Sequence, residues 1–178
     1  RLTSSRMPRE GISDAGLGQL APLEQLERLT IYSSLITDES LKHLADFKSL
    51  RQLILTNSKI SDTGLKTLAG YSQLEELHLE GCRNFTDAGL AHLAALKQLK
   101  KIDLHDTRVT DEGMKSLSSL PQLRVAMLLS TVITDNGLMQ LTKCPSLRRI
   151  NVSGTGITPE GIRKFKQAMP DCRVENFE

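Results

Sequence analysis

Residues 99–122, LKKIDLHDTRVTDEGMKSLSSLPQ, determine the fold, because their pattern of residue types recurs along nearly the whole chain. The first part alternates apolar and polar residues from Leu99 to Leu104, and this period of two indicates a β-strand. The second part begins at Thr110 and spaces apolar residues three positions apart, which indicates a short helix behind a capping threonine. A strand followed by a helix at a short, fixed period predicts a solenoid of stacked units.

Leucine at the start of each expected strand measures the repeat. These residues are Leu2, Leu26, Leu50, Leu74, Leu99, Leu123 and Leu147. They are 24 residues apart, except for 25 residues between Leu74 and Leu99, where the loop 81–85 absorbs the extra residue. We therefore predict one domain over 1–178 with about seven repeats of 24–25 residues. Residues 1–25 form a worn or capping first repeat and residues 172–178 the C-terminal edge.

Composition narrows the class of protein. Hydrophobic residues make up 39% of the chain and aromatic residues 3%, so leucine supplies the expected core. The net charge of +2, from 23 basic and 21 acidic residues, gives no overall attraction to nucleic acid or to a membrane surface. No apolar run approaches the roughly 18 residues of a membrane span. Because the chain begins with Arg1, we expect it to be a fragment of a longer protein.

The three cysteines lie in different repeats and lack metal-ligand spacing. They are Cys82, Cys144 and Cys172. An odd, scattered set favours free thiols and a reducing compartment, so we expect a cytoplasmic protein.

Columns of equivalent polar residues connect each expected strand to its helix. Small residues in the turn after the strand are expected to bond backbone groups; they are Ser34, Ser58, Cys82, Thr107, Thr131 and Thr155. Expected helix N-caps are Thr37, Ser61, Thr86, Thr110, Thr134 and Thr158. An aspartate follows the first five caps and favours the positive end of the helix dipole, whereas Pro159 follows the last. The glycines of the first helical turn, such as Gly113, are expected to let the helix approach a neighbouring backbone.

These motifs resemble the leucine-rich repeat family, in its bacterial and cysteine-containing branch, where an LxxLxL strand motif precedes a TDxGLxxL helix motif. The clearest instances are residues 36–41, 85–90, 109–114 and 133–138. The serines and threonines of the turn column resemble the bacterial arrays abundant in planctomycetes, whereas residues 74–93 resemble repeats of F-box proteins. The resemblance implies an α/β solenoid, a curved horseshoe with a parallel β-sheet on the concave face and helices on the convex face. It also implies protein–protein interaction and supplies no catalytic residues.

Strand residues that point away from the core are free to bind a partner. In the middle of the expected sheet Glu76 faces Lys101, His78 faces Asp103, and Glu80 faces His105, because adjacent strands lie about 4.8 Å apart. Three interpretations are open: a solvated ladder of paired charges, a polar contact with a partner, or a metal site formed by Glu80, His78, Asp103 and His105.

The next expected strand is unusual because all three of its outward residues are apolar. They are Val125, Met127 and Leu129. One interpretation is a slipped strand register or exposed residues without a role. We favour the other, an anchor for a partner or a neighbouring chain, because contiguous exposed apolar area marks interfaces. Tyr32, with Ile54, is a second and weaker anchor.

We therefore predict a non-catalytic module that binds a protein or peptide on its concave sheet, with no cofactor and no nucleic-acid or membrane partner. No phosphate-binding glycine loop, nucleophile elbow or metal-ligand spacing occurs in the sequence. Substrate recognition within an F-box-type ubiquitin ligase is the alternative, followed by a metal-dependent site at His78, Asp103 and His105. Self-association would use the apolar residues or the terminal edge of the sheet.

Overall fold

The computed structural model describes residues 4–6, 13–18, 25–44 and 47–177. Its strands form one parallel eight-stranded sheet in chain order. The strands are β1 (Ser4–Arg6), β2 (Arg28–Tyr32), β3 (Gln52–Thr56), β4 (Glu76–His78), β5 (Lys101–Asp103), β6 (Val125–Met127), β7 (Arg149–Asn151) and β8 (Arg173–Glu175). The helices are α1 (Asp14–Gly18), α2 (Asp38–His43), α3 (Asp62–Leu68), α4 (Asp87–His92), α5 (Asp111–Leu117), α6 (Asp135–Gln140) and α7 (Pro159–Ala168). Short 3₁₀ turns η1 (Leu93–Ala95) and η2 (Leu141–Lys143) follow α4 and α6.

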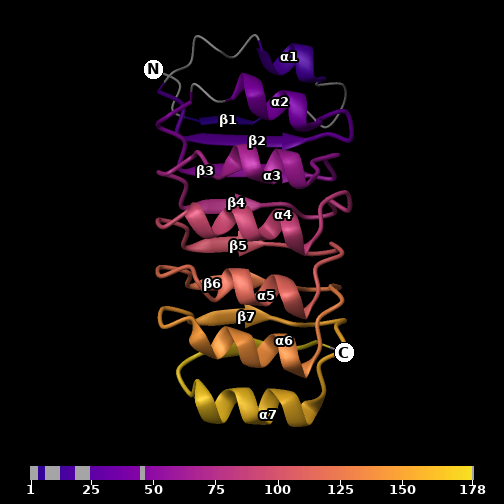
Figure 1. The fold of residues 1–178 in the computed structure, drawn as a ribbon, viewed down its shortest axis with the longest axis vertical. Helices are drawn as coiled ribbons and strands as arrows, with labels where there is room; N and C mark the ends of the chain where they lie inside the picture. The colour runs from indigo at the N-terminus through magenta and orange to yellow at the C-terminus, as the bar shows by residue number, and fades with distance from the viewer. Residues whose placement is uncertain (1–3, 7–12, 19–24, 45–46, 178) are drawn as a thin grey trace.

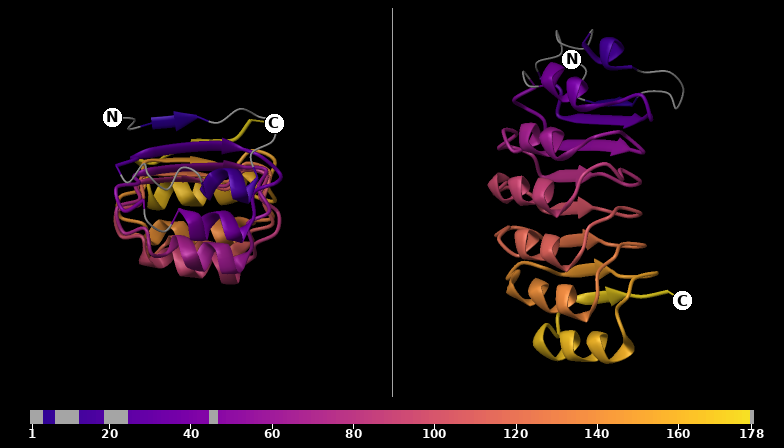
Figure 2. Two further views of the ribbon diagram at one scale, coloured as in Figure 1. Left: turned by 90° about the horizontal axis from the view of Figure 1, so that it is seen from above. Right: turned by 45° about the vertical axis from the view of Figure 1, so that its right-hand side comes forward.

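The repeats stack along the long axis of the molecule (Figure 1). Figure 2 shows the strands as one layer and the helices as a second layer against one face of the sheet. The predicted α/β solenoid is therefore confirmed. We call the face of the sheet opposite the helices the open face.

The core lies between the two layers and is filled by equivalent residues of successive repeats. Leu53, Leu77, Ile102, Ala126 and Ile150 are aligned across β3 to β7, and each has 0% of its surface exposed. Burial of such a leucine or isoleucine stabilises the fold by about 1.5–3 kcal/mol. No single repeat could bury these side chains alone, so the stacking itself supplies the core.

The column of small residues in the turns fulfils its predicted role over most of its length. The hydroxyls of Thr107 and Thr131 donate to the carbonyls of Leu104 and Leu128, which directly follow β5 and β6, at 2.7 Å each. The thiol of Cys82 donates to the Leu55 carbonyl at 2.9 Å, and burial raises its pKa to about 12. Two residues differ from the prediction. Ser34 is exposed and its neighbour Ser33 is buried instead, whereas Ser58 is buried but its hydroxyl forms no hydrogen bond to a backbone group in the described chain.

The predicted N-caps are confirmed, since each hydroxyl accepts a backbone N–H of its own helix. The aspartate after each cap has a further role that we did not predict. Its carboxylate accepts both the backbone N–H and the hydroxyl of the N-cap residue in the next repeat. The pairs are Asp14 with Thr37, Asp38 with Ser61, Asp62 with Thr86, Asp87 with Thr110, Asp111 with Thr134 and Asp135 with Thr158. We call this series the aspartate ladder.

The aspartate ladder also explains the glycines in the first turn of the helices. A Cβ atom at any of these positions would come closer than 3.0 Å to a carboxyl oxygen of the aspartate in the preceding repeat. The positions are Gly64, Gly89, Gly113, Gly137 and Gly161. The expected contact with a neighbouring backbone is thus mainly a contact with a neighbouring carboxylate. In α2 the equivalent residue is Ser40, whose hydroxyl donates to Asp14 Oδ1.

The chain ends are described unequally. Most of the predicted capping repeat, 1–25, lies outside the described residues, apart from β1 and α1. At the other end the predicted C-terminal edge, 172–178, contains β8, which pairs with β7 and places Val174 opposite Ile150. In the part of the chain that the structure describes, none of the helices combines the length and apolar character needed to cross a membrane.

Candidate interaction surface on the open face

Strand register determines which side chains meet on the open face. The first residues of the strands form one row: Arg28, Gln52, Glu76, Lys101, Val125, Arg149 and Arg173. The third residues form a second row: Thr30, Ile54, His78, Asp103, Met127, Asn151 and Glu175. Just beyond the strands, backbone hydrogen bonds between neighbouring repeats continue at Glu80, His105, Leu129 and Ser153.

The middle of the open face carries the charged cluster, which we define as Glu76, His78, Glu80, Lys101, Asp103 and His105. His78 Nδ1 lies 3.5 Å from Asp103 Oδ2, and His105 Nδ1 lies 3.7 Å from Glu80 Oε1. These two predicted pairs are therefore confirmed.

Glu76 and Lys101 are in register as predicted, but they form no ion pair within the described residues. The Glu76 carboxylate instead lies 2.8 Å from Gln52 Nε2 and 3.7 Å from His78 Nε2. The side chain of Lys101 consequently remains without a carboxylate partner in the described chain.

Asp103 is the best-held carboxylate of the charged cluster. Its Oδ1 accepts the backbone N–H of His105 at 3.0 Å, and 18% of its side chain is exposed. Burial by itself raises the pKa of Asp103. The hydrogen bonds from His78 and the His105 backbone, together with the two imidazoles, more than offset it and leave the pKa below 3.8.

The metal interpretation of the charged cluster finds no support. Across residues 4–6, 13–18, 25–44 and 47–177, no three His, Cys, Asp or Glu side chains converge in a way that could hold a metal ion. His78 and Asp103 form one pair and His105 forms another with Glu80.

Val125, Met127 and Leu129, which we call the apolar triad, lie beside the charged cluster. β6 is in register with both neighbours, and Ala126 faces the core with 0% exposure, so a slipped register is excluded. All three residues of the apolar triad are half-buried. Each therefore presents part of its surface on the open face.

Tyr32, the second predicted anchor, is not brought near the apolar triad. It is half-buried at the end of β2, so β3, β4 and β5 lie between it and β6. Tyr32 lines a hollow of about 520 Å³ together with Thr56, Asn57 and Glu80. It belongs to a separate part of the open face.

Sequence reasoning missed Phe177, which has 69% of its surface exposed. It follows Ser153 by 24 residues, and its backbone N–H donates to Ser153 Oγ at 2.8 Å. Ser153 in turn lies beside the loop that contains Leu129. The backbone N–H of Ser130, the residue after Leu129, donates to the Ser153 carbonyl at 2.9 Å. The 24-residue spacing was the signal that could have identified it.

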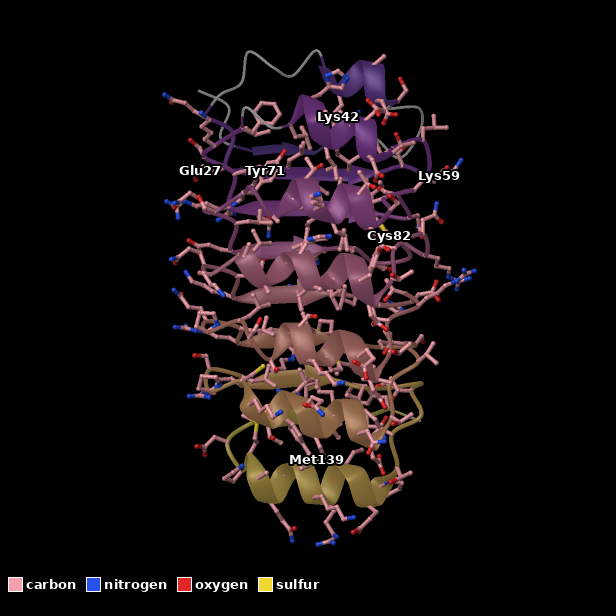
Figure 3. All side chains as sticks on the ribbon, viewed as in Figure 1. Glu27, Lys42, Lys59, Tyr71, Cys82 and Met139 are labelled. Carbon is pink, nitrogen blue, oxygen red and sulfur yellow. The ribbon has the colours of Figure 1, made fainter. Side chains whose placement is uncertain are left out.

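A group of cations at the start of β5 to β8 was also missed as a group, although Lys101 was predicted as a single member of the charged cluster. We call these residues the basic rim: Lys100, Lys101, Arg124, Arg148, Arg149 and Arg173. Backbone hydrogen bonds from Arg124 to Lys100 and from Arg148 to Arg124, at 2.8 and 2.9 Å, make these residues lateral neighbours. Figure 3 shows nitrogen-tipped side chains one below another along the edge on which Glu27 is labelled.

Two outward residues of β7 and the loop after it are buried and hydrogen-bonded to each other, so they are not available to a partner. Asn151 and Ser153 are 8% and 3% exposed. Asn151 Oδ1 accepts the backbone N–H of Ser153 at 3.0 Å and its hydroxyl at 2.8 Å. These two residues therefore stabilise the turn and leave recognition to their neighbours.

The comparisons with known proteins agree with this architecture. A family model described as "Leucine Rich repeat" matches residues 48–69, 73–94, 97–118 and 143–166. Among solved structures, internalin C2 from Listeria monocytogenes is similar, with a TM-score of 0.73 and 19% sequence identity. That alignment covers 98% of this chain and 80% of the internalin chain, and it shows a shared fold. No curated protein sequence matches the chain.

Proposed function

Because the chain belongs to the leucine-rich repeat family, we propose that it is a recognition module that binds a protein or peptide on the open face of its sheet. Proteins of this family generally mediate protein–protein interactions. The observation that carries the proposal is the apolar triad, a set of three neighbouring apolar side chains on a face that is otherwise mostly polar, with Ile54 on β3 as an apolar exception. A few well-packed residues near the centre of an interface supply most of its binding energy, and contiguous exposed apolar side chains are typical of surfaces that bind proteins.

We propose that the charged cluster contacts polar or charged groups of the partner. His78 and Asp103, 15% and 18% exposed, are already paired and fixed. Glu80 and His105 are more exposed, at 47% and 34%, and lie 3.7 Å apart, which leaves their remaining hydrogen-bonding capacity for a partner. Fixed charges of this kind select the orientation of a partner more than they add affinity.

We further propose binding without catalysis. The apolar triad supplies no group that could act as an acid, a base or a nucleophile. The histidines of the charged cluster are paired with carboxylates, and none of the described residues gives them a hydroxyl or thiol partner. The family and its fold are typical of interaction modules, and the geometry supports the same role.

We also propose that the chain is a single domain and is located in the cytoplasm. One cluster of buried residues extends from Leu17 to Cys172, which supports a single domain over residues 1–178. The three cysteines are free and buried, and free thiols support a reducing compartment such as the cytoplasm.

Affinity capture with a double variant tests the proposed function. Met127→Glu with Leu129→Glu places two carboxylates in the apolar triad. The matched control, Leu35→Glu with Met139→Glu, adds two carboxylates at exposed apolar residues, 51% and 37% exposed, away from the triad. Met139 lies on α6, on the helical side of the molecule (Figure 3).

We expect the wild type and the control to retain the same partners and the triad variant to lose them. Circular dichroism should show that both variants keep the wild-type fold, because none of the four replaced side chains is fully buried. Equal recovery of partners by all three proteins would contradict the proposal.

A further inference from the structure

The basic rim carries more positive charge than its acidic neighbours compensate. Lys100 pairs with Glu75 at 2.6 Å, and Glu75 also binds Arg51 at 2.7 Å. Glu175 binds both Arg149 and Arg173, at 3.0 and 3.1 Å. Two carboxylates thus serve several cations at once.

Three cations of the basic rim form no ion pair within the described residues: Lys101, Arg124 and Arg148. The guanidinium of Arg148 donates only to backbone carbonyls, those of Pro145 and Leu147, at 3.2 and 2.9 Å. Arg124 and Arg148 are exposed, so both are accessible to a partner.

The excess of positive charge is local. At the starts of β2 to β4 the equivalent residues alternate in sign or are neutral: Glu27, Arg28, Arg51, Gln52, Glu75 and Glu76. The whole chain has a net charge of only +2. The basic rim therefore results from the distribution of charge along the solenoid.

The basic rim adjoins the apolar triad without a gap. Val125 lies in the same row as the rim, between Lys101 and Arg149. Met127 follows two residues later on β6, and a strand advances about 3.3 Å per residue. A bound segment that packs on the apolar triad is therefore separated from the cations of the basic rim by a distance that one or two of its own residues would span.

We propose that the open face over β5 to β8 binds an acidic peptide segment in which aspartate or glutamate stands next to apolar residues. The apolar residues pack on Val125, Met127 and Leu129, and the carboxylates bind Lys101, Arg124 and Arg148. Arginine binds carboxylates through two parallel hydrogen bonds, which favours a specific contact at Arg124. This inference rests on the proposed function and adds the chemistry of the partner.

Acidic groups on the protein limit where the partner's carboxylates can lie. Asp103 and Glu175 stand in the row of Met127, on the second strand row of the open face. A carboxylate placed in that row would meet like charges, whereas an apolar side chain would not. The acidic residues of the partner are thereby directed to the strand-start edge from Lys101 to Arg149, beyond Glu76 in the same row.

A peptide fits this surface better than a nucleic acid. Proteins that bind single strands combine cations with aromatic side chains on which bases stack. The side chains of β6 that adjoin the basic rim are instead those of Val125 and Met127, and the exposed Phe177 lies beyond the other end of β8. Apolar side chains of this kind complement a peptide.

Selection from a random peptide library displayed on phage tests the inference on the whole chain. We expect the enriched peptides to combine Asp or Glu with Leu, Ile or Phe. Fluorescence anisotropy should then show synthetic copies of them binding about tenfold or more weakly to a Lys101→Glu, Arg124→Glu variant, and more weakly as salt is added. The charge-matched control, Lys59→Glu with Lys66→Glu, should bind as the wild type does.

Two results separate this inference from the proposed function. Enriched peptides that need the apolar triad but contain no excess of acidic residues would overturn the inference and leave the proposed function standing. Peptides whose binding is unaffected by Met127→Glu with Leu129→Glu would contradict both. Tighter binding of a labelled single-stranded oligonucleotide, or of vesicles containing phosphatidylserine, than of any selected peptide would overturn the acidic-peptide assignment.

Discussion

The aspartate ladder predicts that Asp135 and Gly161 depend on each other. Asp135 accepts the backbone N–H and the hydroxyl of Thr158, at 2.8 and 2.7 Å, and so joins α6 to the cap of α7. A Cβ atom at Gly161 would meet three atoms closer than 3.0 Å, and all three belong to the Asp135 carboxyl group. The two positions therefore form a double-mutant cycle in which one variant removes the obstacle that the other encounters.

The expected magnitudes follow from the contacts. Gly161→Ala gains about 1 kcal/mol of helix propensity, but it displaces the carboxylate from Thr158 and crowds it. We expect a net loss of about 1–3 kcal/mol in the free energy of unfolding. Asp135→Ala should lose about 1–3 kcal/mol, at the lower end because Thr158 is exposed. The double variant should be no less stable than Asp135→Ala alone, so the coupling energy is at least the loss expected for Gly161→Ala, about 1–3 kcal/mol.

Urea unfolding followed by far-UV circular dichroism measures these free energies. Gly70→Ala is the control, because the nearest atom to its Cβ would be the Thr67 carbonyl oxygen at 3.4 Å, and we expect a change within about 0.5 kcal/mol. Gly161→Ser should be milder than Gly161→Ala, since Ser40 donates its hydroxyl to Asp14 at the equivalent place in α2. Additive losses, or a Gly161→Ala variant as stable as Gly70→Ala, would refute the reasoning.

Three further predictions concern the core, the charged cluster and the thiols. Ile102→Ala removes a fully buried side chain and should lower the free energy of unfolding by about 2–5 kcal/mol in urea titrations; a loss below about 1 kcal/mol would contradict the packed core. Because folding lowers the pKa of Asp103 below 3.8, its ionised form stabilises the fold above that pH, and this contribution disappears as the pH falls through the lower value. Asp103→Asn should therefore be less stable than the wild type at about pH 6 and closer to it at about pH 3, and a constant difference would exclude this role. Burial raises the pKa of Cys82 to about 12 and the pKa values of Cys144 and Cys172 to about 11, so a maleimide should label them only after unfolding, as mass spectrometry will show.

The repeating sequence specifies the solenoid because its register, its core and its caps depend on local patterns. The alternation at Ile102 and Leu104 identified a strand, and Thr110 identified the start of a helix. The partner of Asp87 could not be predicted in the same way, since it lies 23 residues away in the next repeat. A favourable interaction with the helix dipole already explained an aspartate at this position, so its hydrogen bonds to the next repeat were not predicted.

The open face was predicted where strand alternation alone decides orientation, as at Val125 and Met127. Side-chain pairing was harder to predict, because Glu76 has competing partners: Gln52 and His78 bind it, although Lys101 is in register with it. A sequence pattern gives the register, but the choice among neighbours depends on side-chain geometry.

The basic rim and Phe177 were missed for a different reason. Lys100, Arg124 and Arg148 stand just before the strands, outside the alternating pattern that we used to find outward residues. Phe177 follows the last strand, in the C-terminal edge that lacks the helix motif of the other repeats. The basic rim and Phe177 become part of one surface only when the repeats are stacked, so the pattern within a single repeat does not reveal them.

The central claim is that the partner binds on the open face over β6 and not on the helices. Photo-crosslinking with Met127→p-benzoylphenylalanine tests it most directly, with Met139→p-benzoylphenylalanine on α6 as the matched control. We predict that a selected peptide crosslinks to the protein through residue 127 and not through residue 139. Crosslinking through residue 139, with none through residue 127, would contradict the account.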